Sequence, residues 1–200
     1  MIEQIIAADT AAVEKYNLKA KPEHHLQMSL GPCPYEGNIH TSPVVLLLAN
    51  PGYDKNSSEN DHHFRADGWP LSGLHEDAPA GMRNWWQPRL RQLCSIHGAK
   101  KVASNIAALQ INPWASNKYH DTVRLPSQLL MMELAEAAAR RGAVIVLMRA
   151  SKKWLKSPII SGHADLFRTK SPRCSYISEG NLPSHAWKSI NDQIAASKLY

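Results

Sequence analysis

Apolar residues along the chain alternate between short continuous runs and helical spacings. Two runs, at residues 44–50 and 143–149, have strand length and contain β-branched residues, which is typical of strands buried on both faces of a sheet. We also expect a strand over residues 102–111 and a short one over residues 174–178. Apolar residues spaced three and four apart predict helices over residues 2–16, from Pro88 to Gly98, over 126–141 and from 183 onward.

Strands that alternate with amphipathic helices predict an α/β fold. We expect a three-layer α/β/α sandwich with a mostly parallel central sheet of about four strands, formed as one domain by residues 1–200. In such folds, ligands bind beyond the carboxyl ends of the strands. The segments that begin at Asn50, Asn112 and Arg149 are therefore the first places to look for chemistry.

Positive charge is concentrated in one part of the chain. The net charge is +6, and residues 140–173 hold nine basic residues against one acid, Asp165. This pattern fits a polyphosphate partner such as DNA, and the alternative is a solvated basic surface. The candidate DNA contacts are Arg149, Lys152, Lys153, Lys156, Lys170, Ser171 and Arg173.

Other sequence features bear on where the protein works and on whether it needs a metal or cofactor. No apolar run has the length of a membrane span, and the N-terminus lacks the pattern of a signal peptide. Three irregularly spaced cysteines are too few for a disulfide framework or a zinc site. We therefore expect a cytoplasmic monomer that uses no membrane, metal or cofactor.

The clearest candidate motif is Asn50-Pro51-Gly52-Tyr53-Asp54, directly after the first buried run. An Asn at a strand end could orient a water molecule, and the turn after it could approach a ligand closely. The alternative is an ordinary turn in which Asn50 bonds its own backbone.

The segment VVLLLANPGYD, residues 44–54, resembles the first motif of the uracil-DNA glycosylase superfamily, especially its mismatch-specific branch. The resemblance implies that Asn50 positions the hydrolytic water. LQINPWAS, residues 109–116, is similar to the element with which that family reads the flipped base. Asn112 is the candidate for this role, and Asn105 is the second choice.

KSPRCSYIS, residues 170–178, corresponds to the final loop of that family, which supports the leaving base and enters the minor groove. The family usually has His-Pro-Ser or Asn-Pro-Ser there, whereas this chain has Ser171-Pro172-Arg173. Either Arg173 or His163 is expected to replace the missing side chain.

Strict uracil enzymes of the superfamily carry Tyr where this chain has Gly52, and that ring excludes groups on pyrimidine C5. Gly52 leaves the space open, and the long polar segment 53–82 could shape an enlarged pocket. The resemblance therefore implies a damaged or modified base as the substrate, and one hypothesis is a C5-substituted pyrimidine such as a hypermodified base of phage DNA, in an antiviral role. The alternative is an ordinary repair enzyme for mismatched thymine or uracil. Of Trp85 and Trp86, we expect one in the core and the other stacked on substrate or DNA.

The sequence thus predicts a monofunctional DNA glycosylase that acts on a flipped base. Two alternatives remain. One is a non-catalytic nucleic-acid-binding domain of the same fold. The other is a metal-dependent phosphoesterase, suggested by Asp61-His62-His63, for which the chain lacks further well-spaced acids.

Overall fold

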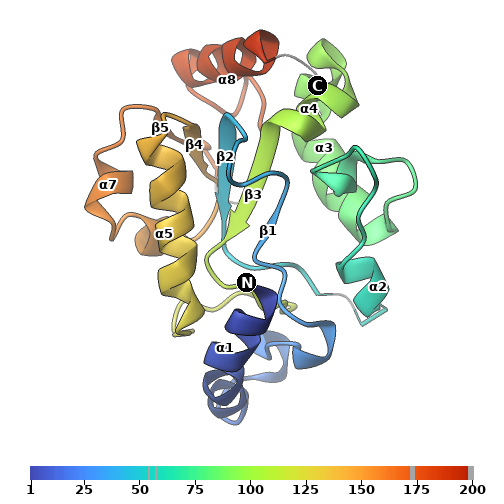
Figure 1. Cartoon of the computed structure of the whole chain (residues 1–200), viewed down its shortest axis with the longest axis vertical. Helices are drawn as coiled ribbons and strands as arrows, with labels where there is room; N and C mark the ends of the chain where they lie inside the picture. Colours follow the sequence, from blue (N-terminus) through green and yellow to red (C-terminus); the bar gives the residue numbers. More distant parts are fainter. Residues whose placement is uncertain (54, 57, 172–173, 198–200) are drawn as a thin grey trace.

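The computed structural model describes residues 1–53, 55–56, 58–171 and 174–197. Figure 1 shows a central sheet with helices on both faces. Short 3-10 turns occur at Pro22–His24, Met28–Leu30 and Ser72–Leu74. The strands are β1 (Tyr35–Glu36), β2 (Val44–Leu48), β3 (Ile106–Gln110), β4 (Val144–Leu147) and β5 (Leu166–Arg168). The helices are α1 (Ile2–Asn17), α2 (Glu59–His62), α3 (Ala80–His97), α4 (Ala99–Asn105), α5 (Ser127–Arg140), α6 (Ser151–Trp154), α7 (Pro158–Ser161) and α8 (Ser184–Ala196).

The described residues form a five-stranded sheet in the order β1-β3-β2-β4-β5. Strands β2 to β5 run parallel, and the short β1 pairs antiparallel with β3. Strand β2 is central, with Val44 aligned to Ile106 of β3 and to Val144 of β4. Because these three strands are in register, their carboxyl ends meet at one edge of the sheet, toward the bottom of Figure 1.

Alternate residues of each strand pack on opposite faces of the sheet. One face, with Val45 and Leu47 at its centre, packs against α1, α5 and α7. The other face, with Val44, Leu46 and Leu48, packs against α3, α4 and α8. All five residues of β2 are at most 1% exposed, so the strand has no solvent face. This arrangement confirms the predicted three-layer α/β/α sandwich with a mostly parallel sheet.

Two helix boundaries differ from the prediction. Helix α3 begins at Ala80, two turns before Pro88, because the apolar stripe of Leu90 and Leu93 already starts at the buried Trp86. Residues 102–105 were predicted as strand but belong to α4. Val102 and Ala103 are buried there by helix packing, which periodicity alone does not distinguish from a buried strand.

The predicted strand at residues 174–178 is wrong for the residues that the structure describes. This segment runs beside α3, where the Ile177 N–H donates to the Arg89 carbonyl at 2.9 Å. The strand beyond β4 is instead β5, in which Phe167 aligns with Val146. Within the described residues, no helix is both long and apolar enough to span a membrane.

A buried carboxylate ties α1 to the two elements that follow β3. Asp9 is fully buried and accepts hydrogen bonds from Trp114 Nε1 at 2.8 Å, from the Ser127 N–H at 2.9 Å and from Ser127 Oγ at 2.5 Å. Since α5 has no side-chain cap of its own, Asp9 supplies that cap from another helix. It also fixes Trp114, two residues after Asn112.

Replacing Asp9 with alanine should lower the free energy of unfolding by about 3 kcal/mol, because the substitution leaves buried donors of Trp114 and Ser127 without an acceptor. Urea denaturation measures this change. Glu14→Ala, at an exposed position of the same helix, is the matched control and should stay within about 0.5 kcal/mol of the wild type. A D9A variant as stable as E14A would show that the Asp9 bonds contribute nothing.

Candidate nucleic-acid site at the strand ends

Three predicted site residues follow three adjacent strands. Asn50 follows β2, Asn112 follows β3 and Arg149 follows β4. Backbone hydrogen bonds join the segments, from the Asn112 N–H to the Ala49 carbonyl at 2.9 Å and from the Arg149 N–H to the Leu47 carbonyl at 3.2 Å. The structure therefore brings all three residues to one edge of the sheet.

The Asn50 side chain is held in one orientation. Its Nδ2 donates to the Pro51 carbonyl at 2.7 Å, to Ser116 Oγ at 2.9 Å and to the Ser116 carbonyl at 3.4 Å. Two of these acceptors are backbone carbonyls, so the amide nitrogen must face them. Among the described residues, Oδ1 receives no hydrogen bond. It is therefore an oriented acceptor on a half-buried side chain.

The backbone around Asn50 is fixed by its neighbours. Trp154, a fully buried residue of α6, donates from Nε1 to the Leu48 carbonyl at 2.9 Å. Ser116 N–H donates to the Pro51 carbonyl at 3.3 Å, and a bridge pairs Ser116 with Gly52. Ser116 is the site residue that the sequence did not single out. Its only signal was its place four residues after Asn112.

Asn112 carries an unpaired donor. The residue is fully buried, its Oδ1 accepts weakly from the Trp114 N–H at 3.4 Å, and its Nδ2 has no partner among the described residues. Gln110 is 7% exposed and its Oε1 is likewise unpaired. A buried polar atom without a partner is costly, so such atoms mark places where a ligand or water completes the bonding.

Asn105, the second choice for base recognition, is not at this site. It ends α4 and precedes β3, so it lies at the amino edge of the sheet, and its Nδ2 donates to the Lys101 carbonyl. His163 is not brought to this site either. Its Nε2 bonds the Ala143 carbonyl just before β4, about 13 Å from the carboxyl end of that strand at a rise of about 3.3 Å per residue.

The turn after Asn50 is open. Gly52 is exposed, and a Cβ built there would meet no atom within 4 Å. Pro51 and Tyr53 are half-buried, and Asp54 lies outside the described residues. A side chain at position 52 would therefore meet no neighbouring atoms of the described residues.

The two adjacent tryptophans have different environments. Trp86 is 1% exposed, packs under the sheet and donates from Nε1 to Glu36 Oε2 at 3.0 Å. Trp85 is half-buried at the border of the core and lies against two arginines, Arg89 and Arg149. Trp86 is therefore a core residue, and Trp85 has a face that a ligand could use.

The predicted DNA contacts divide by exposure. Lys152 and Lys156 are exposed, whereas Lys153 is 8% exposed and donates to the Val123 carbonyl and to Gln128 Oε1. Burial lowers the pKa of Lys153 to about 8, with a further contribution from Arg124. The Lys153 amine therefore points inward to acceptors of the chain itself, unlike the exposed Lys152 and Lys156.

Further along, Lys170 is exposed but donates to the Gly180 carbonyl at 2.9 Å. Ser171 is half-buried, and Arg173 lies outside the described residues. Near the start of this basic region, the backbone after Arg149 is strained: Ala150 has φ = 54°, a left-handed conformation that costs a non-glycine residue about 1 kcal/mol. Such strain is found most often at functional sites.

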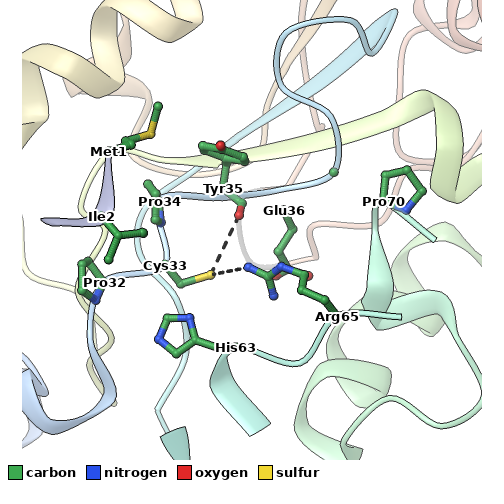
Figure 2. Close-up of a pocket in the computed structure, with 11 residues that line it drawn as sticks. Met1, Ile2, Pro32, Cys33, Pro34, Tyr35, Glu36, His63, Arg65 and Pro70 are labelled. Atoms are coloured by element: carbon green, nitrogen blue, oxygen red, sulfur yellow. Dashed lines mark hydrogen bonds between the residues drawn. The ribbon is translucent and has the colours of Figure 1, made fainter. Parts of the chain in front are cut away.

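The segment 53–82 contributes to a cavity of about 450 Å³ beside the edge strand β1. Figure 2 shows Cys33 between Tyr35 and Arg65, with His63 nearby. Arg65 Nη2 contacts Cys33 Sγ at 3.8 Å, and burial, followed by the Glu36 charge, raises the pKa of the Cys33 thiol to about 11. Cys33 therefore stays a neutral thiol and is a poor nucleophile.

The Asp61-His62-His63 triplet does not converge on one point. Asp61 caps α2 with Ser58, and His63 Nε2 bonds the Leu30 carbonyl at 2.7 Å. Burial lowers the pKa of His62 to about 4, with a smaller contribution from His63. Within the described ranges, no three His, Cys, Asp or Glu side chains are grouped as metal ligands would be.

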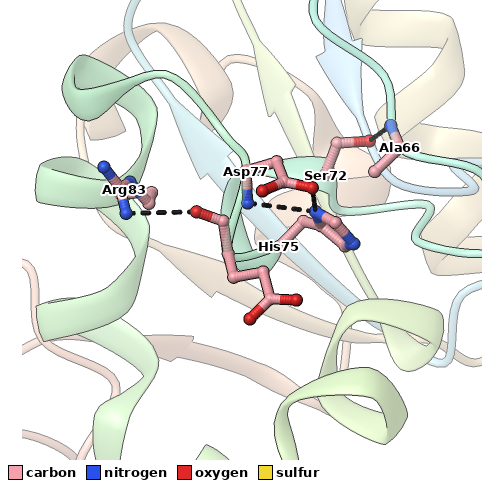
Figure 3. A network of polar contacts seen from close by, with 6 residues as sticks. Ala66, Ser72, His75, Asp77 and Arg83 are labelled. Atoms are coloured by element: carbon pink, nitrogen blue, oxygen red, sulfur yellow. Dashed lines mark hydrogen bonds and ion pairs between the residues drawn. The ribbon is translucent and has the colours of Figure 1, made fainter.

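The rest of this segment is fastened by polar contacts. Figure 3 shows Ser72 Oγ accepting from the Ala66 N–H at 3.0 Å and Asp77 paired with His75. Arg83 of α3 donates to the Glu76 carbonyl at 3.1 Å. These contacts order residues 66–83 and connect them to α3.

Comparisons with protein-family models, with curated proteins and with solved structures find no match to this chain. Its function therefore has to be argued from the residues at the strand ends.

Proposed function

We propose that this chain is a monofunctional DNA glycosylase, which hydrolyses the N-glycosidic bond of a flipped nucleotide and leaves an abasic site. The observation that carries the proposal is the Asn50 amide. Its nitrogen is anchored by Pro51 and Ser116, which leaves Oδ1 as a fixed acceptor at the ligand-binding edge of a parallel sheet. The motif that holds it, residues 44–54, is also the one that resembles the uracil-DNA glycosylase superfamily.

In this mechanism, Oδ1 of Asn50 accepts a hydrogen bond from a water molecule and so directs the water oxygen at the anomeric carbon of the sugar. The C–N bond breaks and the base leaves with the bonding electron pair, so the sugar gains oxocarbenium character. The oriented water adds to the anomeric carbon, and the proton that it loses passes to the departing base anion through solvent. Asn112 Nδ2, which is buried and unpaired, supplies a donor for an acceptor edge of the base. No lysine forms a covalent intermediate, so borohydride should trap no adduct with DNA.

The open space at Gly52 supports a C5-substituted pyrimidine as the substrate, such as a hypermodified base of phage DNA. That substrate would give the enzyme an antiviral role. Absence of a side chain only permits a substituent, so selectivity requires polar groups that the substituent satisfies.

The defining experiment incubates the protein with duplex and single-stranded DNAs that carry uracil, mismatched thymine or C5-substituted pyrimidines. Mass spectrometry should detect the free base, and strands should break only after alkali, with or without EDTA. Direct strand cleavage that EDTA abolishes would establish a phosphoesterase instead. DNA binding without release of any base would establish a non-catalytic binding domain.

Lys152 and Lys156 should contact phosphates. Replacing both with Gln should weaken binding to DNA of any sequence about tenfold and lower the slope of log affinity against log salt by one to two, roughly one per lost contact. Fluorescence anisotropy at several salt concentrations measures both quantities. Lys188→Gln, an exposed lysine on α8, is the control and should change neither. If K152Q/K156Q also changes neither, these lysines are ordinary surface residues.

A further inference from the structure

Two arginine side chains converge on one indole ring. The guanidinium carbon of Arg89, on α3, lies 3.5 Å from the centre of the Trp85 ring, and that of Arg149 lies 5.6 Å from it. Tyr176 completes the cluster, with its ring centre 5.8 Å from the Arg89 guanidinium. The cluster therefore combines residues of α3, of the turn after β4 and of the segment that follows β5.

No anion of the described chain neutralises this pair. Neither Arg89 nor Arg149 forms an ion pair with a carboxylate in the described residues. The Nε atoms of both side chains are buried and have no hydrogen-bond partner among the described residues. Arg89 Nη1 donates to the Trp85 carbonyl at 2.7 Å. Burial and the charge of Arg149 both lower the pKa of Arg89.

Packing alone does not account for this arrangement. One arginine is enough to stack on a tryptophan, and a second positive charge beside it is repulsive. Buried N–H groups without acceptors add a further penalty. A phosphate would remove both penalties, because guanidinium groups bind phosphate oxygens through paired hydrogen bonds.

The position of the cluster points to a particular phosphate. Arg149 is the second residue after β4, and its N–H donates to the carbonyl of Leu47, three residues before Asn50. Neighbouring strands of a sheet are about 4.8 Å apart, so the two side chains start from adjacent strand ends. An anion held by Arg149 would then lie close to the sugar that Asn50 addresses.

We propose that Arg89 and Arg149, braced by Trp85, form a clamp for one phosphodiester that flanks the flipped nucleotide. The clamp rests on the proposed DNA glycosylase function and adds to it a defined phosphate contact. It is distinct from Lys152 and Lys156, which are exposed and provide general attraction to DNA.

The test replaces single phosphates with uncharged methylphosphonates, one at a time, around a central tetrahydrofuran abasic analogue in a short duplex. Wild-type binding should fall about tenfold or more at one linkage beside the analogue. R89Q and R149Q should each lose a similar factor on unmodified DNA, and the neutral linkage should cost these variants almost nothing further. R91Q, an exposed arginine two positions from Arg89 on the same helix, should behave as the wild type at every linkage.

If the free-energy losses in DNA binding from the arginine substitution and from the neutral linkage simply add, so that R89Q or R149Q is still sensitive to the same linkage, the clamp is overturned. Equal sensitivity at all linkages would do so as well. Because the probe contains no base to release, these outcomes are independent of catalysis. If the protein releases a base but no linkage shows coupling to Arg89 and Arg149, the clamp is contradicted and the glycosylase proposal stands. If one linkage shows that coupling but no base is released, the clamp stands and the glycosylase proposal is contradicted. Scanning the wild type needs no variant, so a misfolded arginine variant would not obscure the result.

Discussion

Asn50→Ala should lower the rate of base release by about a thousandfold, the loss typical of removing one oriented polar group from an active site. The alanine removes the oriented Oδ1 acceptor at the end of β2, whose direction is fixed because Nδ2 is occupied by Pro51 and Ser116. Single-turnover assays with alkaline cleavage of the product measure the rate. Affinity for the abasic analogue should stay within about threefold of the wild type, because binding is dominated by phosphate contacts.

Ser116→Ala is the matched companion to this experiment. It leaves Asn50 intact but removes one of the acceptors that orient its amide, so release should slow by about fivefold, the equivalent of one ordinary hydrogen bond. Rates of base release that fall in the order wild type, S116A, N50A would therefore separate the effect of orienting the Asn50 amide from the effect of having it. An N50A enzyme that works within tenfold of the wild type would remove Asn50 from the mechanism.

The sequence predicted the structure best where the apolar pattern is compatible with a single kind of element. The apolar run at residues 44–49 has no polar alternation, so it had to be a strand covered on both faces, and this fixed the sheet and its carboxyl edge. Asn50 and Asn112 then followed from chain direction alone. Arg149 reached the same edge because β4 pairs with β2 in register.

The other differences between expectation and structure depend on tertiary packing, which the local sequence pattern does not contain. Asn105 and His163 lie at the amino edge of the sheet, a strand length from Asn50, and the sequence around residues 102–111 did not reveal where its helix ended. Lys153 looked like its neighbour Lys152, yet it turns inward to the Val123 carbonyl. Only the packing of α6 against the chain decides that difference.

Arg89 shows the same limit from the other side. Arg89 stacks on Trp85, four residues earlier on α3, but Arg149 is 60 residues further along the chain and nothing in the local sequence of Arg89 indicates that contact. The cluster forms because α3 packs on the face of the sheet beside the end of β4, which brings the Trp85 ring and Arg89 to the side chain of Arg149. Long-range contacts of this kind depend on the whole topology.

Gly52→Tyr should abolish release of a C5-substituted pyrimidine, by about a hundredfold or more, while sparing release of plain uracil where the enzyme processes it. The structure makes this substitution informative. A Cβ at Gly52 meets no atom within 4 Å, and its backbone φ is one that any residue adopts, so the variant should fold normally. The added ring would occupy the open space beside the turn, which is where the resemblance to the uracil enzymes predicts the C5 side of the base.

Gly52→Ala is the control for the loss of glycine itself, because its single methyl group leaves most of that space open. It should release the substituted base at close to the wild-type rate. Rates are compared on paired oligonucleotides that differ only in the C5 group, with thermal unfolding of each variant as the check on folding. If G52Y and G52A release the substituted base equally well, the C5 group does not face Gly52. If the wild type releases uracil efficiently and no substituted pyrimidine, the substrate is the plain base, and Gly52 only leaves the turn exposed to solvent.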